Sequence, residues 1–156
     1  MSAFTPEELA YLAGQRLGRL ATVGPDGAPH VMPVSFRYNP DTDTVDIGGR
    51  NLGETKKWRD IGRDPRVAFV VDDVLSPWRP RLIEIRGEAA QLGAGGRELG
   101  QGFAAEIIRI TPKRVVSYGL DDGDRPADWR PRGGTVNPGP VEPPGTGSEP
   151  DRSTDG

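Results

Sequence analysis

The stretch from residue 16 to residue 38 constrains the fold more than any other part of this 156-residue chain. Two apolar runs of β-favouring residues, 17–23 and 30–38, flank a turn made of Gly24, Pro25, Asp26 and Gly27. Proline presets φ for a turn, and glycine tolerates positive φ. The stretch therefore predicts a β-hairpin.

One face of the second run is unusual for a strand because it carries a proline. Strand alternation separates this face from the core face. The unusual face holds Val31, Pro33, Ser35 and Arg37, and the core face holds His30, Met32, Val34, Phe36 and Tyr38. Since proline has no N–H for a strand ladder, Pro33 predicts an edge or a bulge. Backbone groups near Pro33 are then available to something other than a neighbouring strand.

The remaining pattern predicts a mainly β fold. Thr5, Pro6 and Glu8 form a capping-box start for a short helix that ends at Gly14. A second short helix is expected over residues 54–61. Further strands are expected over residues 44–49, 67–71, 82–92, 106–110 and 113–118, with loops at 72–80 and 93–102. The run 67–71 is unbroken and apolar, which predicts burial on both faces. Six or seven short strands without βαβ alternation predict an antiparallel barrel.

Composition divides the chain into a folded domain, residues 1–120, and a disordered tail, residues 121–156. The tail holds seven Gly, seven Pro, eight acidic residues and four Arg. Such a segment cannot bury enough apolar surface to offset its ordering entropy. Four Arg against eight acidic residues give the tail a net charge of −4, which leaves +1 for the domain because the whole chain carries −3. A nearly neutral domain does not favour nucleic-acid binding.

Cysteine and hydropathy patterns narrow the function classes further. The chain has no cysteine, which excludes disulfides, thiol catalysis and cysteine-ligated metal centres. No apolar run approaches the roughly 18 to 20 residues of a membrane span, and the N-terminus lacks a signal-peptide pattern. We therefore expect a cytoplasmic protein without a membrane partner.

The segment that follows the third predicted strand is a candidate phosphate site. It holds Gly48, Gly49, Arg50 and Asn51, and the pair Lys56 and Lys57 comes one turn later. Glycines at a strand end let backbone N–H groups approach an anion, and lysines neutralise phosphate. By spacing alone, a solvated loop with an exposed lysine pair is the favoured interpretation, because charge runs usually lie on the surface.

Other residues give weaker signals. His30 is the single histidine, so a multi-histidine metal site is excluded, and its position at a strand start indicates a packed or turn-bound imidazole. Glu84 and Glu88 flank Arg86 on one strand face, which indicates a charge-balanced surface. Trp78, in a proline-containing loop near Arg81, is a candidate cover for a planar ligand, although partial burial in the core is the favoured interpretation.

Seven short motifs, taken in their order and spacing, indicate a resemblance to a known family. They are RLAT at 19–22, DGAPH at 26–30, PVSF at 33–36, KKWRD at 56–60, DPRVA at 64–68, EIRGEA at 84–89 and IIRITP at 107–112. Together they resemble the pyridoxamine 5'-phosphate oxidase-like split-barrel flavoproteins, in particular the actinobacterial branch described as F420-dependent oxidoreductases. The resemblance covers residues 4–120.

The resemblance implies a homodimer of six-stranded split barrels with a flavin or deazaflavin in each cleft between subunits. Met32, Pro33, Val34 and Ser35 would then line the ring. Residues 48–51 with Lys56 and Lys57 would hold the phosphate, and Trp78 and Arg81 of the partner subunit would close the pocket. A hydride would pass between F420 and a small-molecule substrate with a conjugated C=C, C=N or carbonyl group. No side chain is assigned as an acid or a base.

Three alternatives stay open within this resemblance. The first is an FMN-dependent oxidoreductase of the same fold. The second is a non-catalytic flavin- or F420-binding protein, and the third, more remote, is a haem-binding relative that uses His30 as its imidazole ligand. The basic cluster of true pyridoxamine phosphate oxidases is absent from the sequence, so vitamin B6 oxidation is not expected.

Overall fold

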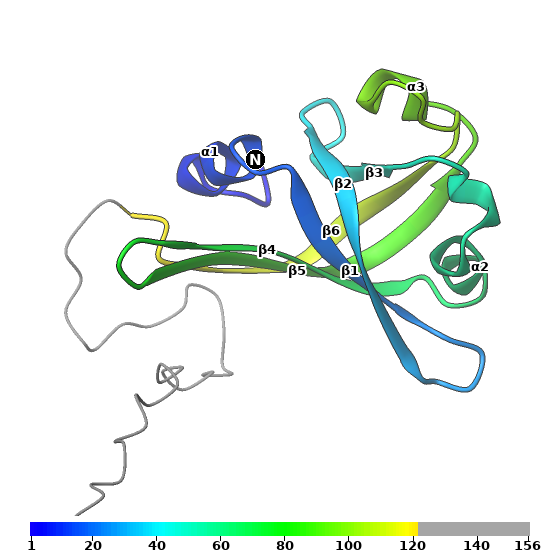
Figure 1. Ribbon diagram of the computed structural model, residues 1–156, viewed down its shortest axis with the longest axis horizontal. Coiled ribbons are helices and arrows are strands. Elements are labelled where there is room, and N and C mark those ends of the chain that lie inside the picture. The colour runs from blue at the N-terminus through cyan, green and yellow to red at the C-terminus, as the bar shows by residue number, and fades with distance from the viewer. Residues whose placement is uncertain (122–156) are drawn as a thin grey trace, which may run out of the picture.

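Helix α1, Pro6–Ala13, opens the computed structural model, which describes residues 1–121 (Figure 1). The predicted capping box is present. The Glu8 N–H donates to Thr5 Oγ1 at 3.2 Å, and the Thr5 N–H donates to Glu8 Oε2 at 2.9 Å. Gly14 is the C-cap, as predicted. The structure therefore confirms this helix and both of its ends.

The predicted hairpin is formed by β1, Leu17–Val23, and β2, Pro29–Asn39. Its antiparallel register runs from the pair Leu17 and Ser35 to the pair Val23 and Pro29. Gly27 lies in the turn with φ 80°, a conformation that favours glycine. Sequence and structure thus agree on this organising element.

Six strands close into one antiparallel barrel in the order β1-β2-β3-β6-β5-β4. The other strands are β3, Thr44–Gly48; β4, Arg66–Leu75; β5, Arg79–Leu92; and β6, Ile107–Tyr118. Between β3 and β4 the chain forms the 3-10 helix η1, Leu52–Glu54, and helix α2, Lys56–Arg63. Helix α3, Gly96–Leu99, lies between β5 and β6. The predicted mainly β, six-stranded barrel is confirmed.

Two predicted interruptions are wrong. Residues 72–80 do not form a loop, because β4 and β5 continue as an extended hairpin in which Asp73 pairs with Arg81 and their side chains form an ion pair at 2.5 Å. The predicted break at Thr111 and Pro112 is also absent, and β6 is continuous. Pro112 faces Gly87 at a register shift in the β5–β6 ladder, where a missing N–H is tolerated.

Strand β4 alternates instead of being buried on both faces as its apolar run predicts. Val67, Phe69 and Val71 are buried in the barrel, whereas Ala68 and Val70 on the outer face are half-buried. The barrel interior supplies burial for one face only. The outer face of β4 is therefore apolar and partly exposed at Ala68 and Val70, between Arg66 and Asp72.

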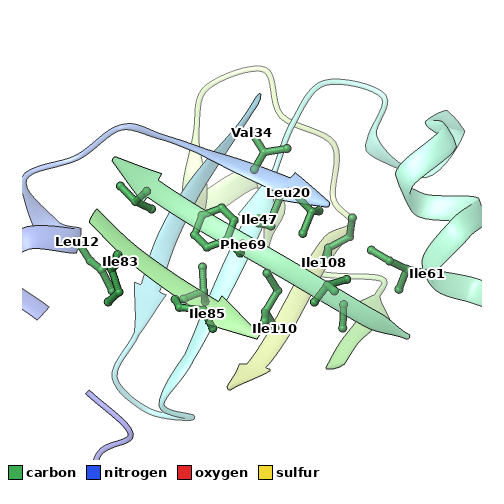
Figure 2. Packing of buried hydrophobic residues seen from close by; sticks show 14 of the residues in the cluster. Leu12, Leu20, Val34, Ile47, Ile61, Phe69, Ile83, Ile85, Ile108 and Ile110 are labelled. Carbon is green, nitrogen blue, oxygen red and sulfur yellow. The ribbon is translucent and has the colours of Figure 1, made fainter. Parts of the chain in front are cut away.

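The core fills the barrel with aliphatic side chains around Phe69, as Figure 2 shows. Leu20, Ile47, Ile85 and Ile108 are each 0% exposed and come from four different strands. The closed barrel holds the six strands in register around this core and so positions the residues at the strand ends.

The predicted tail, residues 121–156, lies outside the described residues except for Asp121. Among residues 1–121, no helix has the length and apolar character needed to cross a membrane.

Candidate functional site

Strand β2 changes partners along its length and leaves part of one edge free. It pairs with β1 over residues 29–35 and, on its other edge, with β3 over residues 35–39. Within residues 1–121, residues 29–34 therefore have a strand neighbour on one edge only. Pro33 lies in this segment, opposite Arg19 of β1. The edge position that the proline predicts is confirmed, and the backbone groups on the free edge are available to a ligand.

The predicted ring-lining segment, residues 32–35, and the predicted phosphate-binding segment, residues 48–51, meet at one register pair of the sheet. Ser35 is the register partner of Gly48, the last residue of β3. Beyond it the chain leaves the sheet through Gly49 and the exposed Arg50 to Asn51, which has φ 51° and opens η1. The residues expected to line a ring and those expected to hold a phosphate thus flank the place where β2 and β3 separate.

The predicted wall of the cleft is only partly accessible. Met32 is 44% exposed and Pro33 is exposed, whereas Ser35 is half-buried and Val34 is buried in the core. The side chain of Val34 therefore packs the barrel, and only its backbone could meet a ligand at this edge.

Helix α2 places Lys56 against a buried carboxylate that the sequence analysis did not identify. Lys56 Nζ donates to the two carboxylate oxygens of Asp60 at 2.9 and 2.8 Å, and Asp60 is 0% exposed. Asp60 also accepts from Thr22 Oγ1 at 2.9 Å and from Arg63 Nη2 at 3.2 Å. The spacings i,i+4 to Lys56 and i,i+3 to Arg63 are the sequence signal that could have indicated this cluster.

Lys57 is in a different environment from its neighbour. It is half-buried, and burial lowers the pKa of its ammonium group. No carboxylate forms a salt bridge with it among the described residues. A cation that is partly removed from water without a counter-ion favours an anionic ligand. Of the predicted lysine pair, Lys57 is therefore the one whose ammonium has no carboxylate partner among residues 1–121.

Asn51 also borders a pocket of about 380 Å³ that does not suit an anion. Glu54 and Glu106 line this pocket together with Trp58. Two carboxylates oppose phosphate binding there. This pocket is therefore not the place where the 48–51 segment would contact a phosphate.

Trp78 and Arg81 do not join the other candidate residues within one chain. They lie at the β4–β5 turn, which Figure 1 shows at the opposite end of the molecule from α2. Trp78 is 48% exposed. Arg81 binds Asp73 and lies over the Tyr11 ring, 4.9 Å from its centroid. Within one chain these two residues are therefore separate from the candidate residues of β2 and α2.

Comparison with known proteins settles the family. The family model described as pyridoxamine 5'-phosphate oxidase matches residues 4–118. The chain belongs to the pyridoxamine 5'-phosphate oxidase family. A family relative, the 5a,11a-dehydrotetracycline/5a,11a-dehydrooxytetracycline reductase of Streptomyces rimosus, is 46% identical over 120 residues, which cover 76% of this chain and 84% of that enzyme.

Solved structures support the same fold. A conserved hypothetical protein, Rv2991 from Mycobacterium tuberculosis, gives a TM-score of 0.59 at 22% identity over 75% of this chain and 86% of that one. An FAD-binding protein from Mycobacterium smegmatis gives 0.58 at 20% identity over 76% and 97%. At these identities the likeness concerns the fold, and it agrees with the split barrel of the pyridoxamine 5'-phosphate oxidase family.

The site suits a planar group that carries a phosphate, as a flavin or deazaflavin of this family would. The free β2 edge offers backbone donors and acceptors, and Lys57 offers a cation that has no counter-ion within residues 1–121. His30 adds a polar atom, because its Nδ1 is buried and has no hydrogen-bond partner in the described part of the chain. His30 faces Thr22 across the hairpin and so belongs to the free segment of β2. Its half-buried position agrees with packing, but the unsatisfied nitrogen is unexpected for a merely packed imidazole.

Asp60→Asn is expected to lower the free energy of unfolding by about 2 kcal/mol at neutral pH, because the variant loses charged hydrogen bonds in a buried position. The hydrogen bond from Lys56 lowers the pKa of Asp60 below its ordinary value. The carboxylate therefore stabilises the fold fully at pH well above the unfolded pKa of about 3.9. That contribution is lost as the pH falls through the folded pKa.

Urea unfolding across the acid range measures this effect. The stability difference between wild type and Asp60→Asn should shrink below about pH 4, whereas Asp41→Asn, at an exposed position, should match wild type throughout. A constant difference at every pH would rule out the charged role of Asp60.

Proposed function

We propose that this chain is an F420-dependent oxidoreductase that transfers a hydride between the deazaflavin and a small conjugated organic substrate. The observation that carries the proposal is the 46% identity to a dehydrotetracycline reductase over nearly the whole described domain. The motif pattern favours F420 over FMN as the cofactor. The free β2 edge, and Lys57 without a salt bridge in the described part of the chain, support a cofactor that carries a ring and a phosphate.

The protein would contribute binding and orientation, and the cofactor, when bound, supplies the hydride chemistry. Backbone groups of residues 30–34 would hold the polar edge of the ring. Lys57 would bind the phosphate, with Lys56 close by and oriented by Asp60. Positioning donor and acceptor at near-attack distance accounts for much of such a rate enhancement, so a dedicated acid or base is not required.

A homodimer would complete this site. The outer faces of β2, β1 and β4 form one surface, because Val31 pairs with Ala21 and Ala21 pairs with Ala68. Leu17 and Val31 on this surface are 50% and 60% exposed. An exposed apolar patch of this kind is typical of a protein interface. A second copy seated there would bring its own β4–β5 turn, with Trp78 and Arg81 of the partner subunit, toward the cleft.

Val31→Asp is expected to convert the dimer to a monomer and to weaken cofactor binding with it, because a buried unpaired charge at an interface is costly. Light scattering after size exclusion measures the first effect, and a cofactor titration measures the second. Thr42→Asp, at an exposed turn position, is the matched control and should change neither. A wild-type monomer that binds F420 normally would contradict the dimeric site.

The function itself is tested by mixing the purified protein with reduced F420 and 5a,11a-dehydrotetracycline. We expect oxidation of F420 that depends on both protein and substrate. Turnover with reduced FMN but not with reduced F420 would move the assignment to an FMN-dependent oxidoreductase. Binding of either cofactor without turnover across quinones, enones and the tetracycline would favour a non-catalytic binding protein.

A further inference from the structure

A second pocket lies between α1, β2 and the segment around α3, and nothing in the preceding assignment uses it. Its volume is about 570 Å³, within the range of small-molecule sites. Figure 1 shows α1 and α3 on opposite sides of the β2–β3 hairpin that lies between them. Apolar side chains from all three places line the pocket: Leu9, Leu12, Phe36, Leu99 and Phe103. Such a lining suits a fused-ring ligand better than a small polar one.

The charged groups that line this pocket are both cationic. Arg16 and Arg37 both line it, and no aspartate or glutamate does. Arg37 Nη1 donates to the backbone oxygen of Glu98 at 3.1 Å, which holds the guanidinium at the pocket wall and leaves its other donors available. Within residues 1–121, neither arginine forms a salt bridge. The charge of the pocket is therefore uncompensated.

One carboxylate that a lining residue contacts is already neutralised. Gln15, which lines the pocket, donates to Asp73 at 3.3 Å. Asp73 is bound by the Arg81 guanidinium and by the Tyr11 hydroxyl, at 2.9 and 3.0 Å. Asp73 thus does not supply a counter-ion to Arg16 or Arg37. An anionic ligand would be the first such partner for both arginines.

The pocket adjoins the proposed cofactor cleft. Ser35 lines it and is also the residue at which β2 passes from its free edge to its pairing with β3. A ligand in the pocket would therefore lie beside the segment to which the ring is assigned. This neighbourhood is where a hydride acceptor has to be placed.

We infer that this pocket binds the substrate of the proposed reaction, and that the substrate is a planar fused-ring compound whose acidic group, a carboxylate or an ionised enol or phenol, is held by Arg16 and Arg37. Guanidinium groups bind planar oxyanions through paired hydrogen bonds and stack on rings, which suits such a compound. The role as a substrate site rests on the proposed function. The ligand preference of the pocket does not.

Binding of a matched probe pair to the full-length protein tests the inference. The probes are anthraquinone-2-carboxylate and its methyl ester, which share the rings and differ in charge, and equilibrium dialysis gives both dissociation constants. Wild type should bind the acid at least about tenfold more tightly than the ester. Arg16→Gln and Arg37→Gln should each weaken the acid about tenfold or more and change the ester less than about threefold.

Two further variants keep the outcome interpretable. Ala13→Trp fills the pocket from the exposed end of α1 and should weaken both probes alike. Arg97→Gln removes a nearby exposed arginine that does not line the pocket and should weaken neither. Arg16 is itself exposed, so its replacement tests the charge even if the Arg37 variant loses the contact to Glu98 and does not fold.

The results separate this inference from the proposed function. Equal wild-type affinity for acid and ester, or an acid affinity that survives both arginine substitutions, overturns the pocket assignment whatever the cofactor does. If wild type binds the acid through these arginines but does not bind F420, the ligand preference stands and the proposed function fails.

Discussion

Replacing Phe69 with alanine is expected to lower the free energy of unfolding by about 3 to 5 kcal/mol, which is the usual cost of removing a large buried ring. Phe69 is 0% exposed and packs edge-to-face on Phe36 with 5.2 Å between ring centroids. Its ring also covers Gly18, where an added Cβ would lie 2.2 Å from Phe69 Cζ. The phenyl ring of Phe69 therefore packs directly against the β1 backbone. Urea unfolding of the purified protein measures the loss.

A double-mutant cycle provides the control for this prediction. Gly18→Ala alone should destabilise through the same close approach, by about 1 to 3 kcal/mol. Combining Gly18→Ala with Phe69→Leu should cost less than the sum of the two single changes, because the smaller side chain makes room for the methyl group. Strict additivity would show that Gly18 and Phe69 are not coupled. A Phe69→Ala variant as stable as wild type would show that Phe69 does not organise the core.

Lys57→Gln is expected to weaken cofactor binding by about 10- to 100-fold, which corresponds to the loss of one charge-assisted hydrogen bond to a phosphate. Lys57 is half-buried and has no salt bridge within the described residues, so its loss leaves no internal partner behind. The free energy of unfolding should therefore stay close to that of wild type. Fluorescence titration with F420 gives the affinity.

Variants of two other lysines serve as comparisons for Lys57→Gln. Lys56→Gln should weaken binding and also destabilise the fold, because it leaves the buried Asp60 carboxylate without its main partner. Lys113→Gln removes a surface cation that pairs with Glu88 on the β5–β6 ladder and should change neither quantity. If Lys57→Gln binds F420 as tightly as wild type, the phosphate is held elsewhere.

Local signals in the sequence predict much of the fold. Two short-range features are observed as predicted: the capping box at Thr5 and Glu8, and the turn that joins the two strands of the first hairpin. The errors arise where pairing between strands, and not the local sequence, determines the secondary structure. Residues 72–80 look like a loop because of their prolines, but the pairing of Asp73 with Arg81 extends the ladder through them. Pro112 looks like a strand end, but a register shift opposite Gly87 accommodates it.

The candidate site was predictable in outline only. Pro33 indicates the free edge because the missing N–H is a local property of one residue. The i,i+4 spacing of Lys56 and Asp60 is a local signal, but the burial of Asp60 against Thr22 of another element is not. The arginine-lined pocket was missed because its apolar wall is not local. The hairpin brings Arg16, just before β1, close to Arg37 of β2, but Leu9 and Phe103 reach the pocket from distant parts of the chain.

The most direct test of the account is a parallel titration of the purified full-length protein with F420 and FMN. We predict saturable F420 binding with a dissociation constant in the micromolar range or below, and FMN binding weaker by at least about tenfold. FMN binding tighter than F420 binding would contradict the deazaflavin assignment. Saturable binding of neither cofactor would contradict the proposed function as a whole.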